Sequence, residues 1–267
     1  MRLTAVLSLE TNTPVPVPCV FMLHPSNGPD QLIESDELQT SRDLPLSEYE
    51  DVYGNRCLRV VIPAGPFSLE SRIMADCVEG IEVDPEADFT LMENIPDDVL
   101  LFLLPSRYCE ADRLGERARV LVEGCIPGYA QVETIRRWIH DHFVYAYGTT
   151  NSSTSAIDVL SSLTGVCRDY AHTGIALCRS LDIPARMVVG YLYDLKPMDL
   201  HAWWEAFVGG RWYSFDATQA SPRGGRIVVA YGRDAADVAI ATYFQDIVLT
   251  RLTVRVGASD LAGERHR

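Results

Sequence analysis

The sequence predicts an α+β fold in which a β-rich N-terminal region is followed by helices and a β-hairpin. Two observations predict it. Apolar residues alternate with polar or small ones through residues 3–9 and again through 67–77, which is the period of a half-buried strand. From residue 89 onward apolar residues recur at helical spacing, most clearly over 130–143. The change of period indicates two structural regions.

The N-terminal region contains several short strand-like segments separated by Pro, Gly and Asn clusters, including the apolar run 57–62. Such a pattern is typical of a small sandwich or open barrel. We therefore predict a β-rich domain over residues 1–88 and a second domain over 89–267, whose core spans 130–220. The tail beyond residue 227 is expected to supply one or two closing strands to the second domain.

The second region begins with the apolar run 99–104, which follows Pro96 and predicts a buried helix. Residues 112–123 and 130–143 predict two further helices, the latter amphipathic. Gly165 then interrupts the chain, and a helix with one apolar face begins at Cys167 and ends before Pro184.

Gly209-Gly210 predicts a two-residue hairpin turn, because glycine accepts the positive φ angles of such turns. If Val208 pairs with Arg211, side chains on one face repeat at every second residue. His201, Trp203 and Asp216 then share a face, and Asp216 lies diagonally opposite His201. Diagonal neighbours are about 7–8 Å apart, within reach of a carboxylate and an imidazole.

Cys167 is predicted to lie in the first turn of its helix, where free backbone N–H groups and the helix dipole favour an anion. A thiol there, beside an imidazole, is a nucleophile. We predict that His201 acts as the base and that Asp216 orients the imidazole, as in a catalytic triad. The Cys167 backbone N–H is a candidate oxyanion donor.

Two aromatic residues are weaker candidates for the substrate cleft. Tyr147 precedes Gly148 in a loop that could approach the thiol, and it is a candidate second oxyanion donor. Trp203 shares the predicted hairpin face with His201 and could form a wall of the cleft. An ordinary loop tyrosine and a packed sheet tryptophan remain the alternatives.

Four segments together resemble the core motifs of the transglutaminase-like superfamily, in particular its bacterial members with an N-terminal β domain. They are residues 165–172, 183–186, 201–205 and 212–218. The resemblance implies a papain-like core in which the helix bearing the cysteine packs on an antiparallel sheet bearing histidine and aspartate. It maps the family's triad onto Cys167, His201 and Asp216.

The superfamily that the sequence resembles includes cross-linking enzymes, cysteine proteases, deamidases and proteins that have lost catalysis. We expect attack on a peptide or carboxamide bond through a thioester, with hydrolysis favoured over amine transfer. A catalytically silent binding or scaffold module is the alternative. A zinc site formed by Cys167, His201 and Asp216 is a further chemical possibility. We expect no cofactor and no metal, and no acidic loop has the ligand spacing of a calcium site.

Net charge and cysteine content limit the binding partners and the cellular location that we expect. The formal net charge of −14 opposes binding to nucleic acid or anionic membranes. The expected partner is therefore a peptide, protein or small amide substrate, and the sequence gives no oligomeric state. Seven scattered cysteines without a Cys-x-x-Cys pair indicate neither a disulfide framework nor a zinc site, and they favour the cytoplasm. The sequence predicts no signal peptide and no membrane span.

Overall fold

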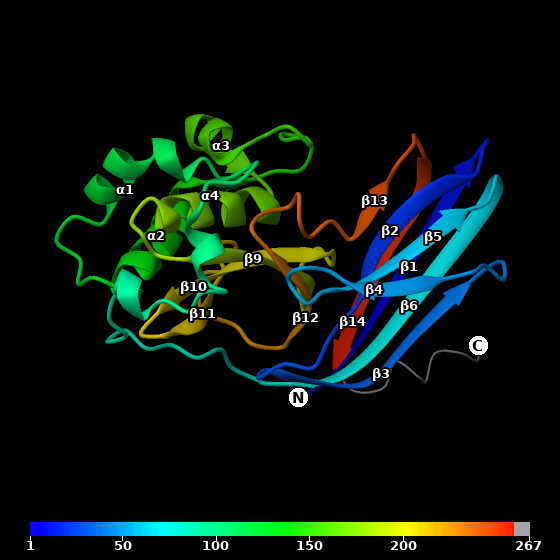
Figure 1. The fold of residues 1–267 in the computed structure, drawn as a ribbon, viewed down its shortest axis with the longest axis horizontal. Coiled ribbons are helices and arrows are strands. Elements are labelled where there is room, and N and C mark those ends of the chain that lie inside the picture. The colour runs from blue at the N-terminus through cyan, green and yellow to red at the C-terminus, as the bar shows by residue number, and fades with distance from the viewer. Residues whose placement is uncertain (259–267) are drawn as a thin grey trace.

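The computed structural model describes residues 1–258, which form a β-sandwich beside a body of mixed helices and strands (Figure 1). One sheet of the sandwich has the order β14-β1-β6-β3, and the other has the order β13-β2-β5-β4. All pairings in both sheets are antiparallel. The strands of the sandwich are β1 (Arg2–Thr13), β2 (Val17–His24), β3 (Gln31–Thr40), β4 (Ser47–Glu50), β5 (Arg56–Ile62), β6 (Gly65–Cys77), β13 (Ala241–Tyr243) and β14 (Val248–Ala258).

The two ends of the described chain meet in this sandwich. β14 pairs along the whole of β1, from Leu3 opposite Ala258 to Asn12 opposite Val248, and β13 pairs with β2. The sequence-based division at residue 88 grouped this tail with the helical region, because a strand pattern does not reveal which sheet the strand joins. The observed partners lie in the N-terminal sheets, and the division itself stays a prediction.

The second body is built on a four-stranded antiparallel sheet of order β11-β10-β9-β12, with helix α4 packed on one face. The strands are β9 (Ala185–Leu192), β10 (His201–Val208), β11 (Arg211–Phe215) and β12 (Arg226–Gly232), and a small parallel pair is formed by β7 (Val144–Tyr145) and β8 (Thr164–Gly165). The helices are α1 (Gly115–Leu121), α2 (Tyr129–His142), α3 (Ala156–Ser162) and α4 (Cys167–Arg179), with 3₁₀ turns at Met92–Asn94, Leu100–Leu103 and Ala111–Arg113. The predicted α+β class is therefore confirmed.

The predicted hairpin is confirmed in its register. Val208 pairs with Arg211 and Glu205 with Ser214. Gly209 and Gly210 have φ angles of 59° and 78°, the left-handed values that this turn requires. The ladder ends at Trp204 opposite Phe215, so Asp216 leaves the sheet just beyond its last paired residue.

The predicted buried helix over 99–104 was wrong. This segment forms a single 3₁₀ turn, Leu100–Leu103, in which Phe102 is the one buried residue, while Leu104 is exposed. Pro96 and Pro105 bound the segment, and the stretch between them is too short for an α-helix to gain from cooperative hydrogen bonding.

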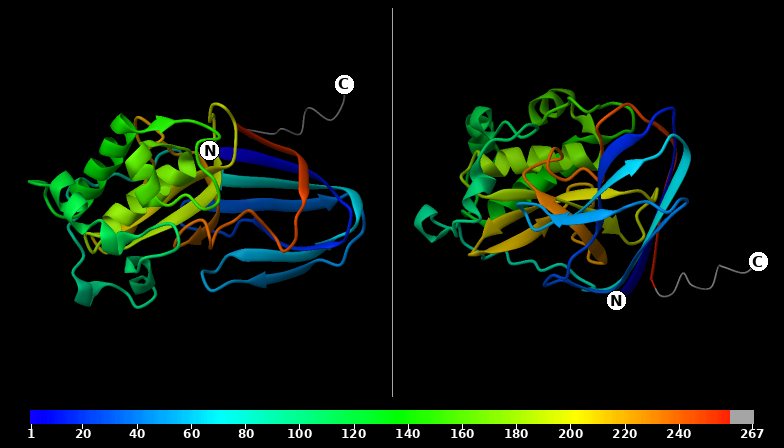
Figure 2. Two further views of the ribbon diagram at one scale, coloured as in Figure 1. Left: turned by 90° about the horizontal axis from the view of Figure 1, so that it is seen from above. Right: turned by 45° about the vertical axis from the view of Figure 1, so that its right-hand side comes forward.

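Two side-chain amides join the sandwich to the outer strand of the second body. Gln31 donates to the carbonyl of Val228 at 2.9 Å and accepts from its N–H at 2.7 Å. Asn55 makes the same pair of bonds with Tyr231, at 2.7 and 2.8 Å. Both amides are buried, and they occupy backbone groups that an edge strand would otherwise leave unpaired. The two bodies stay side by side in both views of Figure 2.

We expect Asn55→Ala to lower the free energy of unfolding by about 1–3 kcal/mol, because the buried N–H and carbonyl of Tyr231 lose their partners. Gln31→Ala should have a similar effect at Val228. Gln39→Ala, at an exposed position of the same strand as Gln31, is the matched control. Urea unfolding followed by circular dichroism measures the difference. Equal unfolding midpoints for all three variants would show that the two amides do not stabilise the contact between the sandwich and β12.

Candidate active site

The helix that carries Cys167 is fixed at its start by the buried carboxylate of Asp169. Asp169 Oδ2 accepts the backbone N–H of Val166 at 2.9 Å and the hydroxyl of Thr150 at 2.6 Å. Arg168 pairs with Oδ1 of the same carboxylate at 2.9 Å. A β-carbon at position 165 would lie 2.7 Å from Cβ of Asp169, so glycine is required there. Cys167 is therefore held in the first turn of α4, as the sequence predicted.

His201 and Asp216 form a buried dyad at the end of the central sheet. His201 is the first residue of β10, and Asp216 follows the last residue of β11. Nε2–H of His201 donates to Oδ2 of Asp216 at 2.7 Å. The other carboxylate oxygen, Oδ1, accepts the backbone N–H of Thr218 at 3.0 Å and its hydroxyl at 2.7 Å. The carboxylate is thus held from both sides.

The charges of the dyad stabilise each other. Burial alone would raise the pKa of Asp216, but the neighbouring His201, Arg226 and Thr218 hold it well below its usual range. Burial alone would lower the pKa of His201, but the Asp216 carboxylate and the Cys167 thiol outweigh it and raise this pKa to about 9. The imidazolium form of His201 is therefore favoured at neutral pH.

The Cys167 thiol lies close enough to this imidazole to contribute to its raised pKa. Because Nε2 is engaged by Asp216, Nδ1 is the ring nitrogen that remains for the thiol. Cys167 is only partly buried, unlike the five buried cysteines. The structure thus brings Cys167, His201 and Asp216 together in one site.

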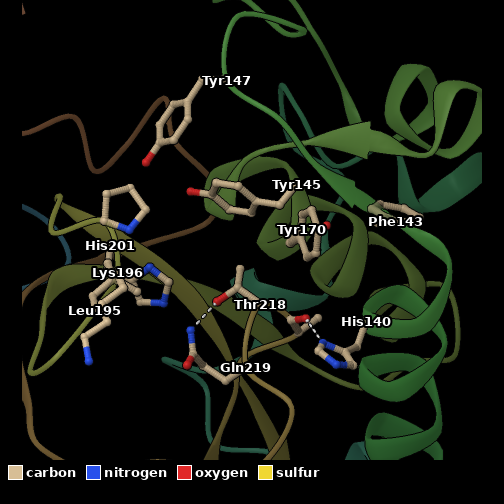
Figure 3. A pocket seen from close by; sticks show the side chains of 12 residues that line it. His140, Phe143, Tyr145, Tyr147, Tyr170, Leu195, Lys196, His201, Thr218 and Gln219 are labelled. Atoms are coloured by element: carbon tan, nitrogen blue, oxygen red, sulfur yellow. Dashed lines mark hydrogen bonds between the residues drawn. The ribbon is translucent and has the colours of Figure 1, made fainter.

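A cavity of about 360 Å³ opens beside His201. Aromatic side chains form much of its wall, and the loop before β10 forms the opposite side (Figure 3). The lining residues are His140, Phe143, Tyr145, Tyr147, Tyr170, Leu195, Lys196, Pro197, His201, Ala217, Thr218 and Gln219. The mixture of aromatic walls and a few polar groups is typical of a site for an organic ligand.

Tyr147 lies at the mouth of the cavity and is 56% exposed. Its hydroxyl donates to Asp199 Oδ2 at 3.3 Å, which links the two loops on either side of the opening. Its ring makes an edge contact with that of Tyr145, with centroids 5.6 Å apart.

Tyr145 lies nearer to the thiol and was not found from the sequence. β7 pairs in parallel with β8, which sets Tyr145 opposite Gly165, two residues before Cys167. Burial, followed by the proximity of Cys167, raises the pKa of the Tyr145 hydroxyl. A strand of two residues has no detectable period, so only the aromatic pair itself could have drawn attention to this position.

Trp203 lies beneath the dyad and does not line the cavity. It is 1% exposed, and its ring stacks on that of His201 with centroids 6.0 Å apart. The guanidinium of Arg226 lies over the same indole at 4.6 Å. The packing alternative that the sequence left open describes this position better than a cleft wall.

Within residues 1–258, no group of three or more His, Cys, Asp or Glu side chains is arranged to hold a metal ion. None of the helices in the same range is both long and apolar enough to span a membrane.

We expect Asp169→Ala to lower the free energy of unfolding by about 1–3 kcal/mol, because the Val166 N–H loses its acceptor and Arg168 loses its partner. Asp141→Ala, on the exposed side of α2, should change it by less than about 0.5 kcal/mol. Chemical denaturation of both variants makes the comparison. Indistinguishable variants would show that Asp169 does not hold the start of α4.

Comparison with known proteins agrees with this geometry. The family described as the transglutaminase-like superfamily matches residues 116–217, a range that contains Cys167, His201 and Asp216. The crystal structure of a candidate cysteine protease from Cytophaga hutchinsonii is 34% identical, with a TM-score of 0.91, and the match covers 97% of this chain and 91% of that one. An uncharacterized protein of Mycobacterium leprae is 37% identical over 112 residues, which is 39% of this chain and 40% of that protein.

Proposed function

Because the chain belongs to the transglutaminase-like superfamily, we propose that it is a cysteine-dependent enzyme that cleaves peptide or carboxamide bonds. Cys167 is the proposed nucleophile, His201 the acid and base, and Asp216 the group that orients His201. One observation carries the proposal. The buried His201–Asp216 hydrogen bond, 2.7 Å long, leaves Nδ1 of His201 free, and His201 lines a cavity and lies close to the partly buried Cys167.

In the proposed first step, the thiolate of Cys167 attacks the carbonyl carbon and forms a C–S bond. His201 then donates its Nδ1 proton to the leaving nitrogen as the C–N bond breaks, and the amine departs from a thioester. In the second step, neutral His201 takes a proton from water, whose oxygen attacks the thioester. The C–S bond then breaks, the carboxylic acid product leaves and loses its proton to solvent, and the thiolate–imidazolium pair is restored.

The developing oxyanion needs donors near the thiol. The backbone N–H of Cys167 supplies one. We assign the second to the Tyr145 hydroxyl, because Tyr145 lies opposite Gly165, two residues before Cys167, and lines the same cavity as His201. Tyr147, the candidate from the sequence, is placed better for contact with bound substrate, since its hydroxyl is directed to Asp199 at the mouth.

The proposed reaction is hydrolysis, by a protease-like or amidase-like activity, in preference to amine transfer. The similarity to a candidate cysteine protease over nearly the whole chain supports this choice. The proposed substrate is a peptide, protein or small amide. We also propose a cytoplasmic location, because all seven cysteines are unpaired thiols. A silent binding module is disfavoured, because stability alone does not require a buried carboxylate, an imidazole and a thiol together.

We expect Cys167→Ala to abolish hydrolysis of peptide and amide libraries, by at least about a thousandfold, without loss of folding. Cys167 should also be the first thiol that iodoacetamide modifies in the wild-type protein, as read by peptide mass spectrometry. Cys125→Ala is the matched control, because Cys125 is the other partly buried cysteine. Equal labelling of Cys125 and Cys167, with activity that survives Cys167→Ala, would exclude the proposed nucleophile.

We expect kcat/KM to fall as the pH rises through about 9, because His201 then loses the proton that it must give to the leaving group. Asp216→Asn removes the charge that raises this pKa, so the alkaline limb should move to lower pH and the rate should fall. The pH–rate profile of both proteins provides the measurement. A wild-type limb near the ordinary histidine pKa of 6.5 would contradict the assigned role of Asp216.

A further inference from the structure

A fourth side chain, Arg226, belongs to the same buried cluster and has no place in the mechanism above. It is the first residue of β12, the outer strand of the central sheet. Its Nη2 donates to Oδ2 of Asp216 at 3.1 Å, and the side chains of both residues are nearly fully buried. Oδ2 is the oxygen that also accepts the proton of His201. Two cations therefore share one carboxylate oxygen.

The remaining contacts of Arg226 hold its guanidinium near the dyad. Nε donates to the backbone carbonyl of Arg223 at 3.0 Å. The guanidinium lies 4.6 Å from the ring centre of Trp203, which in turn stacks on His201. Trp203, which does not line the cavity, therefore packs against both the guanidinium and the imidazole.

The burial of Arg226 lowers the free energy of unfolding. Nη1 of Arg226 has no hydrogen-bond partner within residues 1–258, and the buried charge is only shared with Asp216. The attraction within a buried ion pair offsets the cost of burying its charges only when nearly all of its polar atoms are hydrogen-bonded. A protein with apolar side chains of similar volume in place of the pair is often at least as stable. Stability alone therefore gives a weak reason for an arginine at this position.

We propose that Arg226 is a positioning residue that holds Asp216 and limits how strongly this carboxylate binds the proton of His201. The proposal rests on the triad function proposed above. Without Arg226, Oδ2 would interact with His201 alone, and no nearby positive charge would oppose the imidazolium. The proton would then be held too tightly to pass readily to a leaving group, and the imidazole would be less well oriented.

The charged groups around the dyad come from several elements. Cys167 of α4 and Asp216 face His201 directly. The charges of Glu205 in β10 and of Arg223 act on Arg226, and the charge of Arg136 in α2 interacts with Asp216. Arg136 is already paired with Glu133 at 2.7 Å, whereas Arg226 pairs with Asp216 itself. Arg226 is therefore the cation whose removal should alter His201 most.

The test compares Arg226→Met, Arg226→Gln and Arg226→Lys with the wild-type protein in two measurements. Ring ¹⁵N NMR of His201 gives the pKa of the imidazole without any substrate, and the pH–rate profile gives its value in catalysis. For Arg226→Met we expect the pKa and the alkaline limb to rise by about one unit, because a buried positive charge is lost. kcat should fall about tenfold with little change in KM, because Asp216 is held less firmly.

Arg226→Lys should keep the wild-type pKa of His201 and the wild-type alkaline limb, since lysine keeps the positive charge. Arg226→Gln keeps a hydrogen-bond donor without charge, so it should show the raised pKa with a smaller loss of kcat, and it serves as the readout if Arg226→Met does not fold. A folded Met or Gln variant with the wild-type His201 titration would overturn the proposal. Absence of turnover by the wild-type protein would instead refute the proposed enzymatic function, because the NMR titration tests Arg226 independently of it.

Discussion

The buried hydrogen bond between His201 and Asp216 is the interaction on which the rest of the site depends. It occupies Nε2 of the imidazole, so Nδ1 is the nitrogen left free for the thiol. It also keeps a positive charge on a ring that burial would otherwise neutralise. A carboxylate this deeply buried needs compensation, which comes from His201, Arg226 and both donors of Thr218.

The fold supplies this geometry by placing three chain segments at one end of a sheet. The Gly209-Gly210 turn sets the register that brings His201 and Asp216 to the same end of the hairpin. Asp169 fixes the first turn of α4 and thus the position of the thiol. The sandwich contributes at a distance, through the Gln31 amide that holds β12, the strand on which Arg226 lies.

The local sequence was sufficient to predict the structure at positions where the residue type determines the backbone geometry. Two adjacent glycines specify a two-residue turn, and from that turn the register and the approach of Asp216 to His201 follow by counting. Cys167 was found in the same way, because Gly165 marks the break that begins its helix. The run 99–104 failed because apolar composition was taken for a helix in a segment too short to form one.

The remaining features depend on contacts between distant segments. A two-residue parallel pair sets Tyr145 near Cys167, and Arg226 reaches Asp216 from a strand at the opposite edge of the sheet. The tail strand pairs with β1, about 250 residues away in sequence. Hydrophobic periodicity and turn residues report only on local structure, so they could not predict these contacts between distant segments.

The most direct test of the account is the protonation state of the His201 ring in the resting protein, measured by ¹⁵N NMR on selectively labelled histidine. The account predicts that both ring nitrogens carry protons at pH 7, with one proton shared with Asp216, and that the ring becomes neutral only near pH 9. A His201 ring that is already neutral at pH 7 would contradict the thiolate–imidazolium pair and the mechanism built on it.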